Sequence, residues 1–191
     1  MQITLSTQPP DRQKHKCLVL GFFDDEKPPR GICGLMDWRL NSLISREIKQ
    51  GHIRGEFKEQ VAIPWPERID AEMLFLFGLG GLADLSYDRI YEAAYAVMTA
   101  AGRMKLWDFA FDLPGDGRSM LSPAGVLEAM LTGFFDCLSE DISRLTHTNI
   151  CLVTSPQNLQ EVALGMKRFN ENVRHLGSVD FSALQAHLAG Y

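Results

Sequence analysis

A short apolar run that ends in glycines, Met73 to Gly81, constrains the fold of this chain more than any other feature. An uninterrupted apolar run of this length is typical of a parallel strand that is buried on both faces. A segment with helical spacing begins soon afterwards, near Ser86. In α/β proteins, the glycine turn between a strand and a helix is a common place for a ligand. The run therefore predicts a central strand followed by a candidate binding turn.

Strand-like runs and helical periods alternate along the rest of the chain. The predicted strands are 17–23, 60–63, the run at Met73, 106–113 and 149–154. The predicted helices run from Asp37 to Gly51, from Ser86 to Gly102, from Ser122 without a break through Leu145, and from Ser155 to Val173. Strands separated by helices need crossover connections. We therefore expect a three-layer α/β sandwich, with a mixed, largely parallel sheet and helices on both faces.

The chain is predicted to contain one main domain, because its 191 residues show no internal repeat and no obvious linker. We expect residues 17–176 to form the α/β domain. Residues 1–16 are polar and include two prolines, so they are expected to form a separate N-terminal segment. Residues 177–191 are predicted to be a short helix or a docking tail.

Composition and charge exclude several classes of protein. A formal net charge of −5 provides no overall basic field to attract nucleic acid or anionic lipid. The longest apolar stretch, around 73–83, is far shorter than the roughly 20 residues needed to span a bilayer. The N-terminus lacks the apolar core of a signal peptide, and the four cysteines show no Cys-x-x-Cys pair. We expect a cytoplasmic protein with reduced cysteines and without nucleic-acid or membrane partners.

No set of residues with the spacing of a catalytic or metal site stands out. His147 and Cys151 are four residues apart, but they fall on different predicted elements. The remaining histidines are isolated in sequence and are interpreted as surface or loop residues: His15, His52, His175 and His187. Ser119 and Ser155 have no nearby base, and turn formation or capping explains both. We expect no catalytic residue, no metal ion and no cofactor.

Two glycine-containing turns form the candidate ligand site. Its members are Gly78, Gly80, Gly81, Gly115, Gly117 and Ser119. We expect the turns to face each other at the carboxyl ends of neighbouring strands, where backbone N–H groups can hold a phosphate. Nearby Asp84, Asp112 and Asp116 would repel a phosphate, although one acid could accept a hydrogen bond from a base or ribose. The alternative, that the glycines only make tight turns, is favoured because isolated glycine motifs are weak signals.

The order of motifs resembles the N-terminal domain of the leucyl aminopeptidases. The resemblance is carried by Gly34-Leu35-Met36-Asp37-Trp38, Gly51 to Glu59, the strand that ends in Gly78-Leu79-Gly80, and the helix at 122–135 with Glu128-Ala129-Met130. It implies a macro-domain-like sandwich. In that family the peptidase chemistry belongs to a C-terminal two-metal domain, whose Asn-Thr-Asp-Ala-Glu-Gly-Arg run has no counterpart here. The resemblance therefore implies a stand-alone relative of a non-catalytic domain.

Two functions remain open. The first is a module for assembly, regulation or partner binding, which associates with itself or with another protein. The second is a module that binds an ADP-ribose-like nucleotide, or hydrolyses it weakly, because macro domains hold ADP-ribose in comparable loops. An open cleft between the two turns would favour the second, whereas a filled cleft and an exposed apolar patch elsewhere would favour the first. Trp65, which lies between two prolines, is a candidate anchor for a partner or for a subunit interface.

Overall fold

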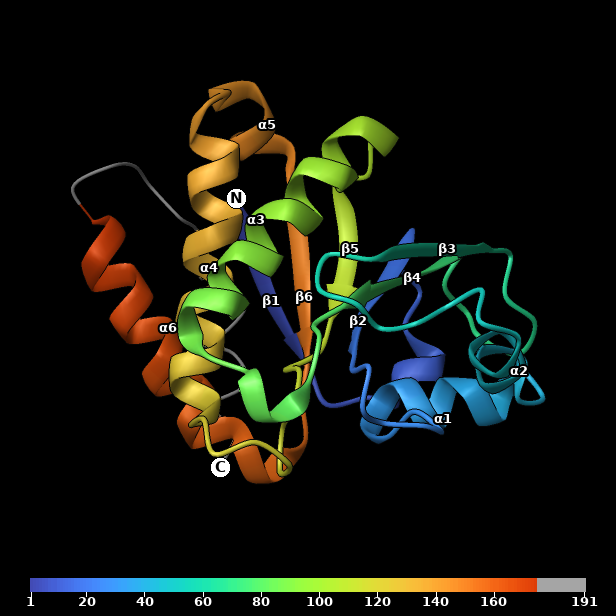
Figure 1. Ribbon diagram of the computed structural model, residues 1–191. Coiled ribbons are helices and arrows are strands. Elements are labelled where there is room, and N and C mark those ends of the chain that lie inside the picture. The colour runs from blue at the N-terminus through green and yellow to red at the C-terminus, as the bar shows by residue number, and fades with distance from the viewer. Residues whose placement is uncertain (175–191) are drawn as a thin grey trace.

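In the computed structural model, the described residues, 1–174, form a six-stranded sheet between two layers of helices (Figure 1). The strands lie in the order β1-β6-β5-β2-β4-β3. Their bounds are β1 Gln2–Ser6, β2 Cys17–Phe22, β3 Gln60–Pro64, β4 Met73–Gly78, β5 Asp108–Phe111 and β6 Asn149–Val153. Each neighbouring pair is parallel except β3 and β4, which are antiparallel. The predicted mixed, largely parallel sheet is confirmed.

The helices cover both faces of the sheet (Figure 1). One layer contains α3 (Tyr87–Met104), α4 (Pro123–Ser139) and α6 (Leu159–Val173), with α4 packed against the other two. The opposite layer contains α1 (Gly31–Arg39) and α2 (Leu43–Gln50), and a short helix, α5 (Ile142–His147), precedes β6. Single 3₁₀ turns are η1 (Pro10–Arg12), η2 (Leu82–Asp84) and η3 (Pro156–Asn158). The predicted three-layer sandwich is confirmed.

Strands β2 and β4 are buried on both faces, which is why neither contains a polar or charged side chain. Side chains alternate across a strand, so Leu18 and Leu20 of β2 join the core under α1 and α2. Val19 joins the larger core under α3, α4 and α6. In β4 the same alternation sends Phe75 and Phe77 to the larger core. Burying a side chain of this size contributes about 1.5–3 kcal/mol, so the apolar runs hold the central strands in place.

The predicted helix from Asp37 to Gly51 is in fact two helices. The chain leaves the helical conformation after α1, because Asn41 and Ser42 have φ angles of 53° and 59°. The carboxylate of buried Asp37 accepts hydrogen bonds from the Ser45 backbone N–H at 3.0 Å and from the Ser45 hydroxyl at 2.5 Å. Asp37 therefore satisfies a donor near the start of α2 while it lies within α1.

The helix from Ser122 also ends earlier than expected. The Ser122 hydroxyl accepts a hydrogen bond from Gly125 N–H at 3.2 Å, as predicted for an N-cap, but α4 ends at Ser139. Asp141 then caps α5 by accepting a hydrogen bond from Ser143 N–H at 3.0 Å. Ile142, which had extended the apolar spacing, is exposed. The Asp141 cap therefore starts a new helix, although the apolar spacing predicts a single continuous one.

The sheet begins before the expected domain start at residue 17. Residues 1–16 were expected to be a separate segment, yet Gln2–Ser6 forms β1 and pairs in parallel with β6. Ile3 is fully buried in the larger core. A short strand with polar neighbours at a sheet edge gives little apolar signal, so composition concealed it. The predicted tail at 177–191 lies outside the described residues.

Candidate functional site

The two predicted turns lie at the carboxyl edge of the sheet, on either side of β2. We expected the two turns to follow neighbouring strands. The structure differs, because β2 lies between β4 and β5. A Cβ atom built on Gly21 of β2 would lie 2.6 Å from Leu79 Cδ1 and 2.9 Å from Pro114 Cβ. Leu79 belongs to the first turn and Pro114 to the second. The turns therefore close over Gly21, a residue that the sequence analysis missed because it lies inside an apolar run.

Backbone N–H groups of both turns are already bonded within the protein. In the first turn, Gly78 N–H donates to Glu59 O at 2.8 Å and Gly80 N–H donates to Gly55 O at 2.9 Å. In the second turn, the Arg118 and Ser119 N–H groups both donate to Gly115 O, at 3.0 and 2.8 Å. A phosphate cradle needs free N–H groups that point at the ligand. These four amides are committed to the fold instead.

Conformation and packing account for glycine at two of the predicted site positions. Gly80 has a φ of +72°, a region that residues with a side chain rarely adopt. A Cβ on Gly78 would lie 2.1 Å from Glu56 O, so only glycine fits against that backbone. Both glycines are therefore explained by the path of the chain before any ligand is considered.

Carboxylates surround the first turn. Both side-chain oxygens of Asp25 accept a hydrogen bond from Leu82 N–H, each at 3.1 Å. A Cβ on Gly81 would lie 3.3 Å from Asp84 Oδ2 and 3.6 Å from Asp24 Oδ1. Asp25 thus accepts the hydrogen bond of the Leu82 N–H group, at the start of η2, which could otherwise donate to an anionic ligand. The surrounding negative charge also opposes a phosphate.

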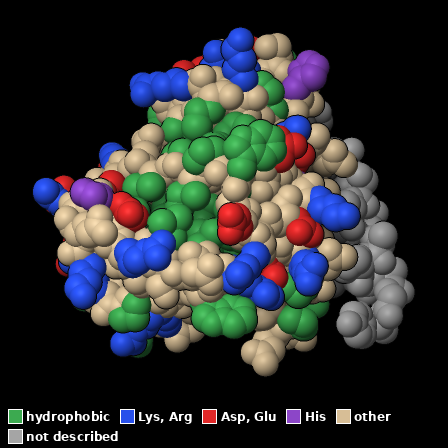
Figure 2. Space-filling view, turned by 90° about the vertical axis from the view of Figure 1, so that its right-hand side faces the viewer, with side chains coloured by type: hydrophobic (Ala, Val, Ile, Leu, Met, Phe, Trp, Pro, Cys, Tyr) green, Lys and Arg blue, Asp and Glu red, His purple; other side chains and the backbone are tan. Residues whose placement is uncertain are grey.

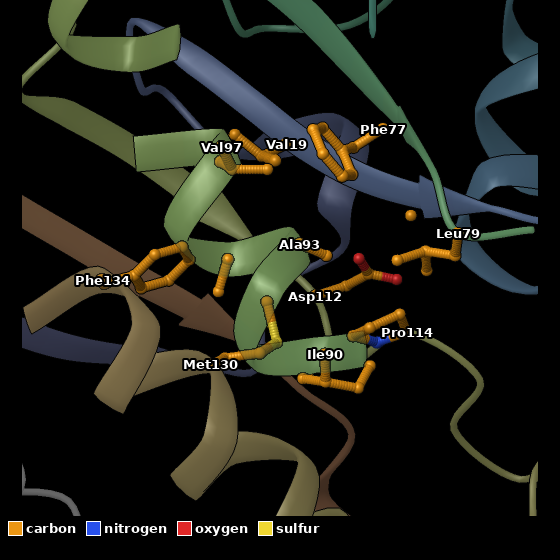
Figure 3. Close-up of a pocket in the computed structure, with 12 residues that line it drawn as sticks. Val19, Phe77, Leu79, Ile90, Ala93, Val97, Asp112, Pro114, Met130 and Phe134 are labelled. Carbon is orange, nitrogen blue, oxygen red and sulfur yellow. The ribbon is translucent and has the colours of Figure 1, made fainter. Parts of the chain in front are cut away.

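A small apolar cavity lies behind the two turns, between the sheet and helices α3 and α4 (Figure 3). Its volume is about 30 Å³. Figure 3 shows Leu79, Pro114 and Asp112 at one end of the cavity and Phe134 at the other. A space of this size holds one or two water molecules. It is far smaller than the sites of roughly 300 Å³ or more that bind small molecules.

Asp112, just after β5, is the buried acid of this region. Its side chain lies beside Leu79 and Pro114 (Figure 3). Burial raises the pKa of Asp112 to about 7, although the nearby Arg118 guanidinium and the hydrogen bond from the Gly21 backbone act in the opposite direction. A carboxyl group with this pKa is about half protonated at neutral pH. Asp112 can therefore both donate and accept hydrogen bonds where the two turns meet.

Arg118 closes the site on the side of α1. It comes from the second turn and forms an ion pair with buried Glu26, which belongs to the loop between β2 and α1. The guanidinium carbon lies 5.4 Å from the centroid of the Phe23 ring. Arg118 Nη2 lies 2.9 Å from the position of a Cβ on Gly31, the first residue of α1. The start of α1 is therefore covered by an arginine that is neutralised internally.

No candidate metal centre lies at the predicted site within residues 1–174. No group of three or more His, Cys, Asp or Glu residues within 1–174 could hold a metal ion. Likewise, none of the helices in this part of the chain is long and apolar enough to cross a membrane.

An exposed aromatic face lies on the opposite side of the sheet from α3, α4 and α6. Trp38 of α1 is 68% exposed and Trp65, just after β3, is 75% exposed. A groove of about 370 Å³ adjoins Trp65 and is lined by Arg39, Leu40 and Ile63 among others. Figure 2 shows hydrophobic side chains gathered in patches on this side of the molecule, with Lys and Arg around them. We call the surface formed by Trp38, Arg39, Ile63 and Trp65 the tryptophan face.

Solved structures share this fold. A Trypanosoma brucei macrodomain in complex with ADP-ribose superposes with a TM-score of 0.66 at 14% identity, over 90% of this chain and 68% of that chain. A mutant of tomato leucine aminopeptidase superposes with a TM-score of 0.59 at 14% identity, over 87% of this chain and 35% of that chain. These likenesses confirm the predicted macrodomain-like fold.

Sequence comparison identifies the family. The model of the cytosol aminopeptidase family, N-terminal domain, matches residues 19–141. A probable cytosol aminopeptidase from Geobacter sp. (strain M21) is 29% identical over 114 residues, which make up 60% of this chain but only 23% of that protein. The chain thus matches less than a quarter of its relative. Because the family model covers well over half of its residues, this chain belongs to the cytosol aminopeptidase family, in the region of that family's N-terminal domain.

Proposed function

We propose that this domain is a non-catalytic assembly module that associates with a second copy of itself through the tryptophan face. The observation that carries the proposal is the closure of the two turns over Gly21, where Leu79 and Pro114 fill the end of the sheet. The Arg118–Glu26 ion pair closes the neighbouring edge. A site filled by the protein's own side chains supports a structural role for this edge.

The composition of the tryptophan face supports an interface. Tryptophan and arginine are the residues most enriched among those that dominate binding energy. The Arg39 guanidinium carbon lies 5.1 Å from the centroid of the Trp38 ring, and Arg39 also pairs with buried Asp11 at 2.7 Å. This ion pair holds the arginine in place beside the ring. The face therefore presents two exposed tryptophan side chains beside an arginine that its ion pair already orients.

Sedimentation equilibrium of the purified chain tests the assembly proposal. We expect a concentration-dependent dimer, weakened about thirtyfold by Trp65→Ala, because removing an interface tryptophan commonly costs about 2 kcal/mol. Ile142→Ala is the matched control, since Ile142 is also an exposed apolar residue but lies on α5. A monomer at all concentrations, or an equal loss in both variants, would contradict the proposal.

ADP-ribose binding is the second candidate function. It is favoured by the buried, half-protonated Asp112 and by Arg118 Nε, which is buried and has no hydrogen-bond partner within the described residues. A macrodomain of the same fold is known in complex with ADP-ribose. In this alternative, the Arg118–Glu26 pair opens and the arginine contacts the pyrophosphate. The ADP-ribose alternative predicts saturable binding of ADP-ribose. The assembly proposal predicts none, because side chains fill the carboxyl edge of the sheet.

A further inference from the structure

Strand β3 forms one end of the sheet and is open to solvent. Among the described strands its one neighbour is β4 (Figure 1). β1 forms the other end, and apart from Gln2 its side chains are buried or only partly exposed. In β3, by contrast, Gln60, Ala62 and Pro64 are all exposed. An accessible edge strand is a template for pairing with another strand.

Hydrogen bonds at both ends of β3 show which of its residues face β4. Gly78 N–H donates to Glu59 O, just before the strand, and Trp65 N–H donates to Glu72 O, just after it, both at 2.8 Å. In an antiparallel pair, residues that bond to the neighbouring strand alternate with residues that do not. The odd-numbered residues of β3 therefore bond to β4, and the even-numbered residues direct their backbone groups away from the sheet.

The outward row consists of Gln60, Ala62 and Pro64. Gln60 and Ala62 each present an N–H and a C=O group, whereas Pro64 presents only a C=O group. Native edge strands are commonly protected by charged side chains, lysine above all. None of the side chains of β3 is charged. The strand therefore lacks the usual protection against pairing.

A second copy of β3 supplies a complementary row. Two antiparallel copies related by a two-fold axis at Ala62 place Ala62 opposite itself and Gln60 opposite the partner's Pro64. Each Ala62 N–H then donates to the partner's Ala62 C=O, and each Gln60 N–H donates to the partner's Pro64 C=O. Proline has no donor but keeps its acceptor. Every outward N–H group is therefore satisfied, although the strand contains a proline.

The same register also brings apolar side chains together. Val61 and Ile63 are partly exposed and pack against the core under α1 and α2. In the paired strands each Val61 lies opposite the partner's Ile63, at a position without backbone hydrogen bonds, where side chains approach most closely. Such cross-strand pairs stabilise a sheet. The small side chain of Ala62 leaves the axis free of bulk.

Charge and size favour a partner that also uses the tryptophan face. Lys58 precedes β3 and Glu67 follows it, and both are exposed. Antiparallel pairing brings Lys58, which already pairs with Glu92 at 2.8 Å, toward the opposite charge of the partner's Glu67. A stable interface buries about 800 Å² on each partner, more than a five-residue strand can supply. Ile63 belongs to both β3 and the tryptophan face, so the two surfaces are continuous.

We propose that β3 pairs with β3 of a second copy, antiparallel about a two-fold axis at Ala62, so that two six-stranded sheets join into one. The inference rests on the proposed assembly function and specifies how the two copies meet. The axis is perpendicular to the sheet, so α1 and α2 of both copies lie on the same side of the joined sheet. The tryptophan faces extend the contact on that side.

Opposite charges at Ala62 test the axis. In sedimentation equilibrium we expect Ala62→Lys and Ala62→Glu each to dimerise about thirtyfold more weakly than the parent, because like charges then lie opposite each other. An equimolar mixture of the two variants should regain most of the parent's affinity. Ala83→Lys is the matched control, since Ala83 is an exposed alanine in η2, and it should leave the dimer unchanged. Unchanged dimerisation of both variants at Ala62, or no recovery in the mixture, would overturn the proposal.

Amide hydrogen exchange, followed by NMR at low and high chain concentration, tests the outward row. We expect exchange at Gln60 and Ala62 to slow about tenfold or more in the dimer, because both N–H groups then donate to a partner's carbonyl. The N–H groups of Val61 and Ile63 bond to β4 in either state and are the internal control, which should change little. Equal slowing at odd- and even-numbered residues, or none at Gln60 and Ala62, would contradict edge pairing.

The outcomes separate edge pairing from the assembly proposal itself. A dimer that is weakened by Trp65→Ala but not by Ala62→Lys would overturn the edge pairing and leave the tryptophan face as the interface. A parent chain that stays monomeric at all concentrations would overturn both.

Discussion

Single residues decide whether the end of the sheet is open or closed. Gly21 lets Leu79 and Pro114 approach each other, and Asp112 lies beside them without leaving the protein interior. The two turns were visible in the sequence because glycines follow apolar runs. Their closure was not, since it depends on the side chain that Gly21 lacks and on Arg118, which pairs with Glu26 across 92 residues of sequence. A sequence pattern can predict that a turn forms, but it does not predict which side chains fill the space between two turns.

The raised pKa of Asp112 makes the stability of the protein depend on pH. The pKa of Asp112 is about 7 in the folded state, against 3.8 for an ordinary aspartate, so the folded state binds the proton more tightly than the unfolded state. The stabilisation is therefore fully present below the unfolded value and is lost as pH rises through the folded value. Between pH 6 and pH 8 this group alone should lower the free energy of unfolding by about 1 kcal/mol.

Asp112→Asn removes this titration while it keeps the size of the side chain. Urea denaturation of both proteins at pH 6 and pH 8 measures the difference, and comparing the variant with the parent cancels the contributions of the other titrating groups. We expect the variant to gain stability relative to the parent as pH rises. If the gap between the two proteins is the same at both pH values, the Asp112 carboxyl does not titrate in this range.

At the scale of elements, the sequence predicted what depends on local pattern. The strands at Cys17 and Met73 and the caps at Ser86 and Ser122 are confirmed. It missed helix breaks that depend on single side-chain hydrogen bonds, such as the Asp37–Ser45 contact at the start of α2. It also missed β1, because an edge strand shows its apolar side at only a few positions. Periodicity finds buried elements, whereas helix breaks are set by single side-chain hydrogen bonds and the edge strand by its pairing with a strand distant in sequence.

β1 should contribute to the stability of the whole domain. Ile3 is fully buried in the larger core and is aligned with Ile150 of β6. We expect Ile3→Ala to lower the free energy of unfolding by about 2–5 kcal/mol, because it leaves a cavity in a packed core. Gln2→Ala is the control, since Gln2 is exposed on the same strand, and it should change stability by less than about 0.5 kcal/mol. Equal stability of the two variants would mean that β1 is not part of the folded unit.

At the scale of the whole molecule, the candidate functional surfaces are separated. The closed turns lie at the carboxyl edge of the sheet, and the tryptophan face lies on the side of α1 and β3. Family membership and fold are shared with proteins of different roles, so function has to be argued from these surfaces. The filled end of the sheet and the exposed tryptophans together support an assembly role.

Calorimetric titration with ADP-ribose tests the central claim, that the end of the sheet is packed, most directly. Gly81→Glu is the suitable companion variant, because Gly81 has a φ of −69° and accepts a side chain without backbone strain, whereas Gly80 does not. We expect no saturable heat from the parent protein up to about 1 mM ligand, a weak limit for a specific site. Saturable binding at one site per chain, lost in Gly81→Glu while the variant stays folded, would contradict the claim and place a nucleotide between the two turns.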